Sequence, residues 1–425
     1  MKRSALFLML AVLSALPALL LRFGLGAHPD HGRRLIVFAG GELSGASAAL
    51  IFGLGVLAGA FMISWSAELL QLDLSQNLAI AIIALVTVLP EYTVDIYLSW
   101  TAATVPENVP LALANMTGAN RLLIGLGWPM VLAAVIWKGR GRHIELEPAR
   151  WGELLFLGAA TVYSLVIPLK GTLTLWDTAI LGLIFVLYIR YVARQEVVEP
   201  DLEGPAALFA AWSVGSRRLV TGGLFLFAAV TLFASAEPFA EGLKFAGEGW
   251  GISEFLMIQW IAPLASESPE FLIALIFTLR GASTAGLGAL VSSKVNQWTL
   301  LVGMIPLAYM LGLLASGQQA AVFPLGPRQQ GEVLLTAAQS FFAVVVILDR
   351  RFSVRDAVLL ATLFIAQLGI TIGIEEMVDP ARQMALFHTE KIIFSILYFV
   401  LGGAWLVRQW HHLPALLKLV WEAER

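Results

Sequence analysis

The sequence has no cysteine and few charged residues, which excludes several classes of protein. Without Cys among its 425 residues, the chain has no disulfide, thiolate metal site or cysteine nucleophile. Charged residues make up 13% of the chain, against about 25% in soluble domains, and 58% of residues are hydrophobic with a mean hydropathy of +0.80. The formal net charge is −3, without the basic footprint of nucleic-acid binding. The composition excludes an ordinary soluble protein and a nucleic-acid partner.

Motifs for nucleotide and resident-metal chemistry are also missing. The sequence has no Walker-type phosphate loop, and its histidines fall in predicted loops or near the chain ends without metal-ligand spacing on a helix. We therefore expect no cofactor, no ATP-driven pumping and no enzymatic activity. A membrane-embedded transferase is the enzyme class considered, but it needs an asymmetric polar cluster, whereas the polar residues here are duplicated.

Apolar runs of roughly 20 residues recur from end to end, each long enough to cross a lipid bilayer as a helix. They predict an all-α polytopic membrane protein, because only helices or closed barrels satisfy their backbone groups in lipid. The predicted helices, about 12 in number, cover residues 4–23, 45–70, 76–100, 108–137, 152–169, 173–193, 218–245, 251–279, 283–314, 331–349, 356–375 and 391–408.

The distribution of Lys and Arg predicts the orientation in the membrane. Lys2 and Arg3 precede the first apolar run, which is long for a signal peptide and lacks a clear cleavage site, so we expect an uncleaved span. Most basic residues fall in predicted loops on the same side of the membrane as the N-terminus, and cytoplasmic loops are enriched in Lys and Arg. We expect a prokaryotic cytoplasmic membrane with both termini inside; the sequence carries no signal for an oligomeric state.

The chain contains an internal repeat built around two Pro-Glu dipeptides. The copies read Val86-Thr87-Val88-Leu89-Pro90-Glu91 and Ala265-Ser266-Glu267-Ser268-Pro269-Glu270. Five predicted helices separate corresponding points, so the two copies cross the membrane in opposite senses. Inverted repeats with a midplane site on broken helices are a recurring transporter architecture.

The repeat gives a domain organisation of two inverted five-helix repeats with one extra helix at each end. Residues 1–44 form the N-terminal transmembrane helix and loop, and 377–425 the C-terminal transmembrane helix and tail. Residues 45–194 and 218–376 form the two repeats, joined by a cytoplasmic linker over 195–217.

The Pro-Glu helices carry the chemistry of a cation site. A proline inside a helix frees the carbonyl four residues earlier, and freed carbonyls beside carboxylates are hard oxygen ligands suited to Na⁺ or Ca²⁺. An acid inside the membrane is costly and is therefore a functional candidate. Glu91 and Glu270 are the leading pair, and helical spacing places Asp95 beside Glu91 and Glu267 beside Glu270.

The helix after each Pro-Glu segment is rich in small and amide residues. The first contains Asn115-Met116-Thr117-Gly118-Ala119-Asn120-Arg121, and the second Gly288-Ala289-Leu290-Val291-Ser292-Ser293-Lys294-Val295-Asn296-Gln297. Together with the Pro-Glu segments, this pattern resembles the calcium/cation antiporter superfamily, most closely its sodium/calcium exchanger branch. That family has two inverted five-helix halves, each with a Gly-Thr-Ser-Leu-Pro-Glu motif followed by Gly-Ser-Asn-x-x-Asn.

The resemblance implies a set of cation ligands. It assigns the two cation-binding glutamates to Glu91 and Glu270 and the two hydroxyl positions of the Pro-Glu motif to Thr87 and Ser266. In the following helices it assigns Ser293, Gln297 and Asn120 to the hydroxyl and amide positions.

Two basic residues depart from the family pattern. Lys294 replaces the first asparagine of the second motif, and Arg121 follows the matching asparagine of the first. Fixed positive charges near the site oppose Ca²⁺ and Na⁺, and Lys294 could instead pair with Glu270 or Glu267 and compete with the cation.

The sequence therefore predicts a secondary active cation antiporter, exchanging Na⁺ and Ca²⁺ or a cation and H⁺ by alternating access. The resemblance implies that the helices near 45–70 and 218–245 move. The alternative is a non-transporting relative whose site acids are locked by Lys294 and Arg121.

Overall fold

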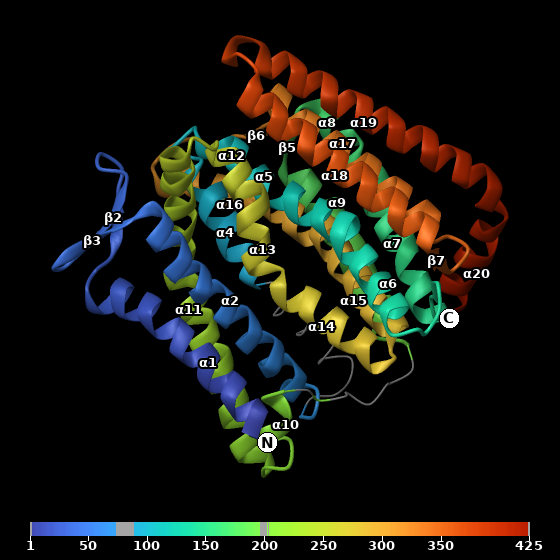
Figure 1. The fold of residues 1–425 in the computed structure, drawn as a ribbon, viewed down its shortest axis with the longest axis horizontal. Helices are drawn as coiled ribbons and strands as arrows, with labels where there is room; N and C mark the ends of the chain where they lie inside the picture. The colour runs from blue at the N-terminus through green and yellow to red at the C-terminus, as the bar shows by residue number, and fades with distance from the viewer. Residues whose placement is uncertain (1, 74–88, 196–201, 203, 424–425) are drawn as a thin grey trace. The chain divides into compact units, whose positions relative to one another are not determined.

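The computed structural model describes residues 2–73, 89–195, 202 and 204–423, which are mostly helical (Figure 1). Nine helices of this part of the chain are long and apolar enough to cross a membrane, and a bent helix pair makes a tenth if it is one span. The prediction of an all-α integral membrane protein is thereby confirmed. The nine are Ser4–Gly24, Gly45–Leu70, Asn108–Trp137, Arg150–Lys170, Leu175–Val192, Val214–Trp250, Ser283–Ala315, Val354–Met377 and Ala381–Glu422.

The chain divides into two units, and the first comprises residues 1–98 and 193–269. Its helices and strands are α1 (Lys2–Leu19), η1 (Leu20–Gly24), β1 (His28–Asp30), β2 (Leu35–Phe38), β3 (Gly41–Ser44), α2 (Gly45–Leu70), most of α4 (Leu89–Thr101), α10 (Ala206–Phe209), α11 (Val214–Trp250), α12 (Glu254–Leu256), η3 (Met257–Ile261) and α13 (Ala262–Ser266). The strands form one antiparallel sheet in the order β1-β2-β3.

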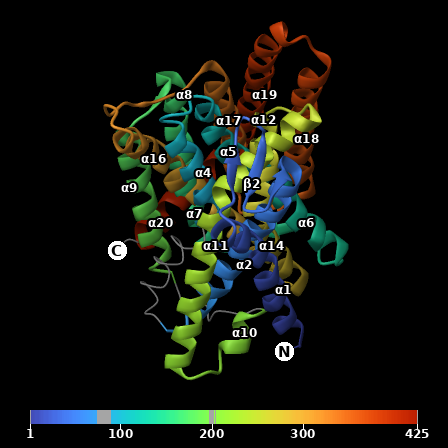
Figure 2. The same ribbon diagram turned by 90° about the vertical axis from the view of Figure 1, so that its left-hand side faces the viewer.

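Helices α2 and α11 form the main packing contact of this unit, with α1 alongside α2 (Figures 1 and 2). Glycines allow the close approach: a Cβ on Gly242 would lie 2.7 Å from the backbone nitrogen of Ala49, and one on Gly45 would lie 2.4 Å from that of Ala246. Small residues at such crossings let helix backbones approach closely within a membrane. The contact therefore depends on the absence of side chains at these two positions.

The second unit comprises residues 99–192 and 270–425. Its elements are α5 (Asn108–Leu122), η2 (Leu123–Gly127), α6 (Trp128–Trp137), β4 (His143–Glu145), α7 (Pro148–Ser164), α8 (Val166–Lys170), β5 (Thr172–Leu173), α9 (Leu175–Val192), most of α14 (Ser268–Arg280), α15 (Ser283–Asn296), η4 (Gln297–Leu301), α16 (Val302–Ala315), β6 (Phe323–Pro324), α17 (Pro327–Val346), β7 (Arg351–Ser353), α18 (Val354–Met377), α19 (Pro380–Gln409), η5 (Trp410–His412) and α20 (Leu413–Ala423).

A continuous hydrophobic core fills the second unit between α6, α7, α15, α17 and α19. Its largest fully buried side chains include Trp128, Phe342 and Phe352. Two short antiparallel strand pairs close the loops: Ile144 of β4 faces Phe352 of β7, and β5 pairs with β6. Helices α17 and α19 pack along one another, so α19 is an integral part of this core.

Two of the predicted membrane helices differ clearly from the observed ones. The predicted helix 251–279 is broken at Glu267, and its two parts, Glu254–Ser266 and Ser268–Arg280, are bent by 48°. The predicted helix 391–408 begins at Pro380 in the structure, so residues 380–390 belong to α19 as well. Charged residues in the first half of α19 interrupt the apolar run from which the helix was predicted. In the structure, Glu390 and Lys391 of this half are buried and paired with one another. Of the predicted helix 76–100, residues 76–88 lie outside the described residues.

Candidate cation-binding site

The first Pro-Glu segment lies on helix α4, which is described from Leu89 onward. Glu91 and Asp95 follow on the same face one turn apart, and their exposed fractions are 1% and 0%. Thr87, the expected hydroxyl ligand, lies outside the described residues. Two carboxylates so deeply buried on an apolar helix need cations or protons as partners.

The second Pro-Glu segment lies at the helix break. Helix α13 ends at Ser266, and α14 starts again at Ser268. The hydroxyl of Ser266 donates to the carbonyl of Ala262 at 3.4 Å, and the Glu267 backbone N–H donates to the carbonyl of Pro263 at 2.8 Å. The break follows from Pro269, which has no N–H to donate and displaces the preceding turn.

The two glutamates of this segment differ in burial. Glu267 is fully buried, whereas Glu270, in the first turn of α14, is partly exposed. A negative charge in the first turn is favoured by the helix dipole. The break therefore provides a position where a carboxylate and a helix N-terminus coincide.

Asn120 and Lys294 are brought together in the second unit, although 174 residues separate them. The Lys294 ammonium donates to the backbone carbonyl of Asn120 at 2.8 Å and to its Oδ1 at 2.6 Å. The Asn120 Nδ2 donates to the carbonyl of Met116 at 3.0 Å, which orients the Oδ1 toward Lys294. The amide oxygen expected to bind a cation thus binds a cationic side chain.

Lys294 is itself fully buried, and its ammonium lies 5.5 Å from the centre of the Trp298 ring. An aromatic face near an ammonium adds a cation–π attraction. Gln297, fully buried at the start of the π-helix η4, and the partly buried Ser293 belong to the same continuous helical segment. Three predicted site residues therefore follow one another on α15 and η4.

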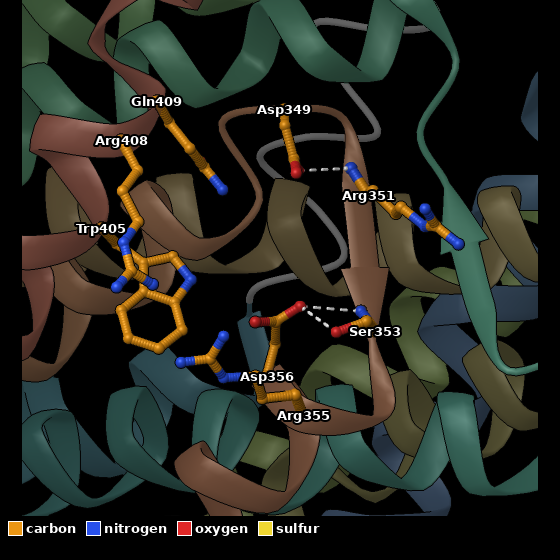
Figure 3. A pocket seen from close by; sticks show the side chains of 8 residues that line it. All are labelled: Asp349, Arg351, Ser353, Arg355, Asp356, Trp405, Arg408 and Gln409. Atoms are coloured by element: carbon orange, nitrogen blue, oxygen red, sulfur yellow. Dashed lines mark hydrogen bonds between the residues drawn. The ribbon is translucent and has the colours of Figure 1, made fainter.

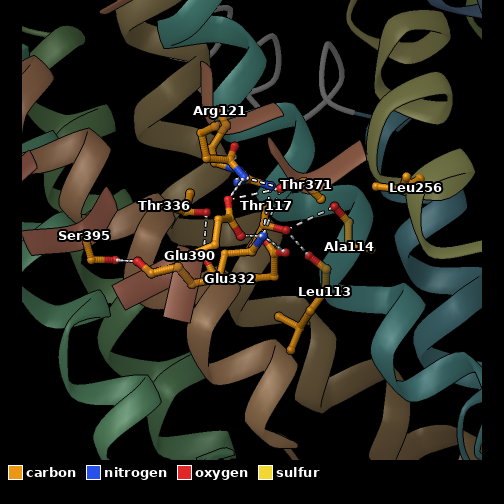
Figure 4. Close-up of polar contacts among 12 residues, drawn as sticks. Leu113, Ala114, Thr117, Arg121, Leu256, Glu332, Thr336, Thr371, Glu390 and Ser395 are labelled. Atoms are coloured by element: carbon orange, nitrogen blue, oxygen red, sulfur yellow. Dashed lines mark hydrogen bonds and ion pairs between the residues drawn. The ribbon is translucent and has the colours of Figure 1, made fainter. Parts of the chain in front are cut away.

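Arg121 lies in a buried ion-pair network (Figure 4). Its guanidinium contacts the Glu332 carboxylate of α17 at 2.8 Å and donates to the Gln367 amide oxygen of α18 at 3.0 Å. Glu332 also contacts the Lys391 ammonium at 3.2 Å, and Lys391 contacts Glu390 at 2.6 Å. Arg121 thus has an acid partner outside the predicted set of cation ligands.

Residue-by-residue interpretation of the sequence missed this network. It also missed the buried Glu153 of α7, whose carboxylate accepts hydrogen bonds from Ser292 at 2.6 Å and Tyr188 at 3.2 Å and pairs with Arg150 at 2.9 Å. The available signal was an acid inside a predicted transmembrane helix, which is a functional candidate in itself. Glu332 and Glu153 both meet that criterion.

The described residues include no cluster of three or more His, Asp or Glu side chains that could hold a metal ion. The site residues instead offer single carboxylates, hydroxyls and amide oxygens, the ligand types that suit Ca²⁺ and Na⁺.

Three comparisons relate the chain to known proteins. The profile of the family described as "Sodium/calcium exchanger protein" matches residues 44–194 and 220–373. The crystal structure of an H⁺/Ca²⁺ exchanger, CAX, matches with a TM-score of 0.86 and 37% identity, covering 99% of this chain and 98% of that chain. The sodium-calcium exchanger NCX_Mj, soaked with 100 mM Na⁺ and 10 mM Sr²⁺, shares the fold with a TM-score of 0.51 and 15% identity, covering 76% of this chain and 98% of that one. No curated protein sequence matches the chain.

Proposed function

Because the chain belongs to the sodium/calcium exchanger protein family, we propose that it is a secondary active antiporter that exchanges Ca²⁺ for H⁺. The 37% identity with an H⁺/Ca²⁺ exchanger over nearly the whole chain carries this proposal. The family description names Na⁺ as well, so Na⁺ is the second candidate for the counter-ion. The protein is an exchanger rather than an enzyme, and its substrates are inorganic cations.

The proposed architecture has twelve transmembrane helices in two inverted five-helix repeats, 45–194 and 218–376, with one extra helix at each end. The nine apolar helices and the bent pair support this architecture, and α17 and the segment that includes α4 would add the last two spans. The remaining segments are the N-terminal helix and loop, 1–44, the linker, 195–217, and the C-terminal helix and tail, 377–425. The proposed location is a prokaryotic cytoplasmic membrane with both termini inside.

The proposed cation site uses the carboxylates of Glu91 and Glu270 as its principal ligands. The burial of Glu91 supports this role, because a charge in the membrane interior requires a counter-ion. Ca²⁺ takes six to eight oxygen ligands, so further donors are needed beside two carboxylates. We assign these to Asp95, Glu267, Thr87, Ser266, Ser293, Gln297 and Asn120.

Lys294 is proposed to act as an internal cation that competes with the transported one. Its ammonium already binds Asn120 Oδ1 at 2.6 Å, so a metal ion that uses this oxygen must displace it. When the metal leaves, the ammonium returns a positive charge to a group of buried acids, whose bare charges would otherwise be costly. Arg121, in contrast, is held by Glu332 at 2.8 Å, and we propose that it modulates the charge of the site from that position.

Alternating access is proposed to move α2 and α11, the helices joined through Gly242 and Gly45. A contact made of small residues brings the two helix backbones close together, so that the pair can move as one body. Protonation of Glu91 and Glu270 would neutralise the site on the return step, so that protons and Ca²⁺ use the same carboxylates in turn.

The test is ion flux in reconstituted vesicles. Uptake of radioactive Ca²⁺ is measured against an outward H⁺ gradient and, separately, an outward Na⁺ gradient, for the wild type and for Glu91→Gln and Glu270→Gln. Glu107→Gln is the matched control, since Glu107 is exposed in the loop after α4. We expect H⁺-driven uptake that both site variants abolish and the control retains.

Other outcomes separate the alternatives. Uptake driven only by the Na⁺ gradient would identify Na⁺ rather than H⁺ as the counter-ion. Full transport by both site variants would refute the site, and absence of flux under either gradient would favour a non-transporting relative locked by Lys294 and Arg121.

A further inference from the structure

A pocket of about 290 Å³ lies in the second unit where the loop before β7, the start of α18 and the end of α19 meet (Figure 3). Its polar lining residues are Asp349, Arg351, Ser353, Arg355, Asp356, Arg408 and Gln409, and Trp405 forms its apolar wall. We propose that this pocket binds the phosphate of an anionic phospholipid headgroup. Neither the ion exchange nor the family assignment requires such a site.

Two arginines on the Trp405 ring supply the phosphate donors. The guanidinium carbon of Arg355 lies 4.3 Å from the ring centre and that of Arg408 lies 5.7 Å from it. Stacking on an aromatic face orders a guanidinium while its N–H donors stay in the plane of the group, and these donors match phosphate oxygens in pairs. The pocket therefore presents two oriented phosphate binders before any ligand enters.

The two aspartates of the pocket already accept bonds from the protein. Oδ2 of Asp356 accepts from the Ser353 backbone N–H at 2.8 Å and from its hydroxyl at 2.6 Å, which caps helix α18. Oδ1 of Asp349 accepts from the Arg351 backbone N–H at 3.0 Å. Both carboxylates thus stabilise the loop and the helix start.

The charge of the lining indicates an anionic ligand. Three arginines and two aspartates give a formal charge of +1, which complements the single negative charge of a phosphodiester. A zwitterionic headgroup has no net charge to match it. The cavity therefore favours a lipid of the phosphatidylglycerol type over phosphatidylcholine.

The neighbouring helix α20 places the pocket at the level of the headgroups. It buries Leu416 and Val420 against the protein, whereas Leu413, Leu417 and Trp421, spaced four residues apart, form an apolar stripe that is 37%, 53% and 65% exposed. A short amphipathic helix with such a stripe lies in the membrane interface. Three residues that line the pocket, Trp405, Arg408 and Gln409, lie at the end of the apolar helix α19, just before α20 in the chain.

The ligand's source follows from this position. Free phosphate and a lipid share the phosphate chemistry, but a lipid at the interface is already concentrated beside the arginines and adds its acyl chains to binding. Basic pockets between transmembrane helices at the membrane surface bind anionic headgroups elsewhere for the same reason. We commit to the lipid.

The experiment titrates the detergent-purified full chain with phosphatidylglycerol or phosphatidylcholine and counts bound lipids by native mass spectrometry. We expect phosphatidylglycerol to bind the wild type and Arg355→Gln/Arg408→Gln to bind it about tenfold more weakly, since two charge-assisted contacts are lost. Arg382→Gln is the matched control, because Arg382 is an exposed arginine near the other end of α19. The single variant Arg408→Gln, at an exposed side chain, should weaken binding in the same direction and serves if the double variant fails to fold.

Three results would overturn the proposal. Equal binding of phosphatidylglycerol by the wild type and the folded arginine variants would remove the pocket from lipid binding. Equal binding of phosphatidylcholine would remove the role of charge. Displacement of the lipid by inorganic phosphate at an equal concentration would show that the pocket takes the free ion instead.

Discussion

Replacing Glu332 by Gln tests the buried network that joins α5, α17 and α19. The Glu332 side chain is 1% exposed, and its two oxygens contact Arg121 at 2.8 Å and Lys391 at 3.2 Å. Because Gln carries no charge, both cations lose a counter-ion in a region almost without water. Removing one partner of a buried pair costs about 3–5 kcal/mol, and we expect Glu332→Gln to lose that much free energy of unfolding.

Lys391 and Arg121 have different further contacts. Lys391 keeps Glu390 at 2.6 Å, whereas Arg121 keeps the neutral amide oxygen of Gln367 at 3.0 Å. Glu332→Gln thus removes the carboxylate that Arg121 contacts at 2.8 Å. Replacing Arg121 by Gln in the same chain removes the guanidinium charge as well, so the double variant should be more stable than the sum of the two single losses by about 1–3 kcal/mol.

The assay is reversible unfolding in mixed micelles with increasing dodecyl sulfate, monitored by circular dichroism. Glu422→Gln is the matched control, because Glu422 pairs with Lys418 at 3.6 Å while both side chains are mostly exposed. Surface pairs of that kind contribute about 0–1 kcal/mol. A loss for Glu332→Gln no larger than that of the control, or strict additivity in the double variant, would refute the reasoning.

Three further predictions concern the ion site, the helix contact and pH. Lys294→Met should lower the KM for Ca²⁺ several-fold, because a competing ammonium is removed; an unchanged KM in vesicle flux assays would contradict competition. Gly242→Ala should destabilise the protein by about 1–3 kcal/mol and slow exchange, whereas Gly249→Ala, whose Cβ meets nothing within 4 Å, should do neither; equal effects would count against the glycine contact. The Arg217 hydrogen bond lowers the pKa of Asp73, so its contribution is full at neutral pH and is lost as pH falls below about 4. In acid titrations of unfolding, the stability gap between the wild type and Asp73→Asn should close below that pH, and a constant gap would exclude a titrating pair.

Local patterns were sufficient to predict the class of the protein and its family. Apolar runs specify transmembrane helices, because lipid leaves the backbone no other partner, and all but one of the predicted spans lie largely in described helices. The duplicated Pro-Glu segments are contiguous in sequence, so the resemblance that they carry was visible without a structure, and the family match confirms it. The roles assigned to Glu91, Glu270 and the other ligands stay predictions.

Partner choice, in contrast, was decided by the tertiary structure. The sequence showed that Lys294 and Arg121 lie inside apolar segments, but it left open whether Lys294 pairs with Glu270 or Glu267, and for Arg121 it offered only the site acids as a group. The structure shows a contact of Lys294 with Asn120 and one of Arg121 with Glu332, while the pairing of Lys294 with either glutamate stays a prediction. Such contacts join residues far apart in the chain, and their pairing depends on how helices pack rather than on any local spacing.

The same reason explains the helix that was predicted too short. In α19, Glu390 and Lys391 have the composition of a loop, and only the packing of α19 against α17 makes them buried and paired. Hydropathy along the sequence indicated which segments can enter the membrane, because each residue adds its own transfer free energy to a segment. Which buried charges neutralise one another depends on distances between helices, and these exist only once the chain has folded.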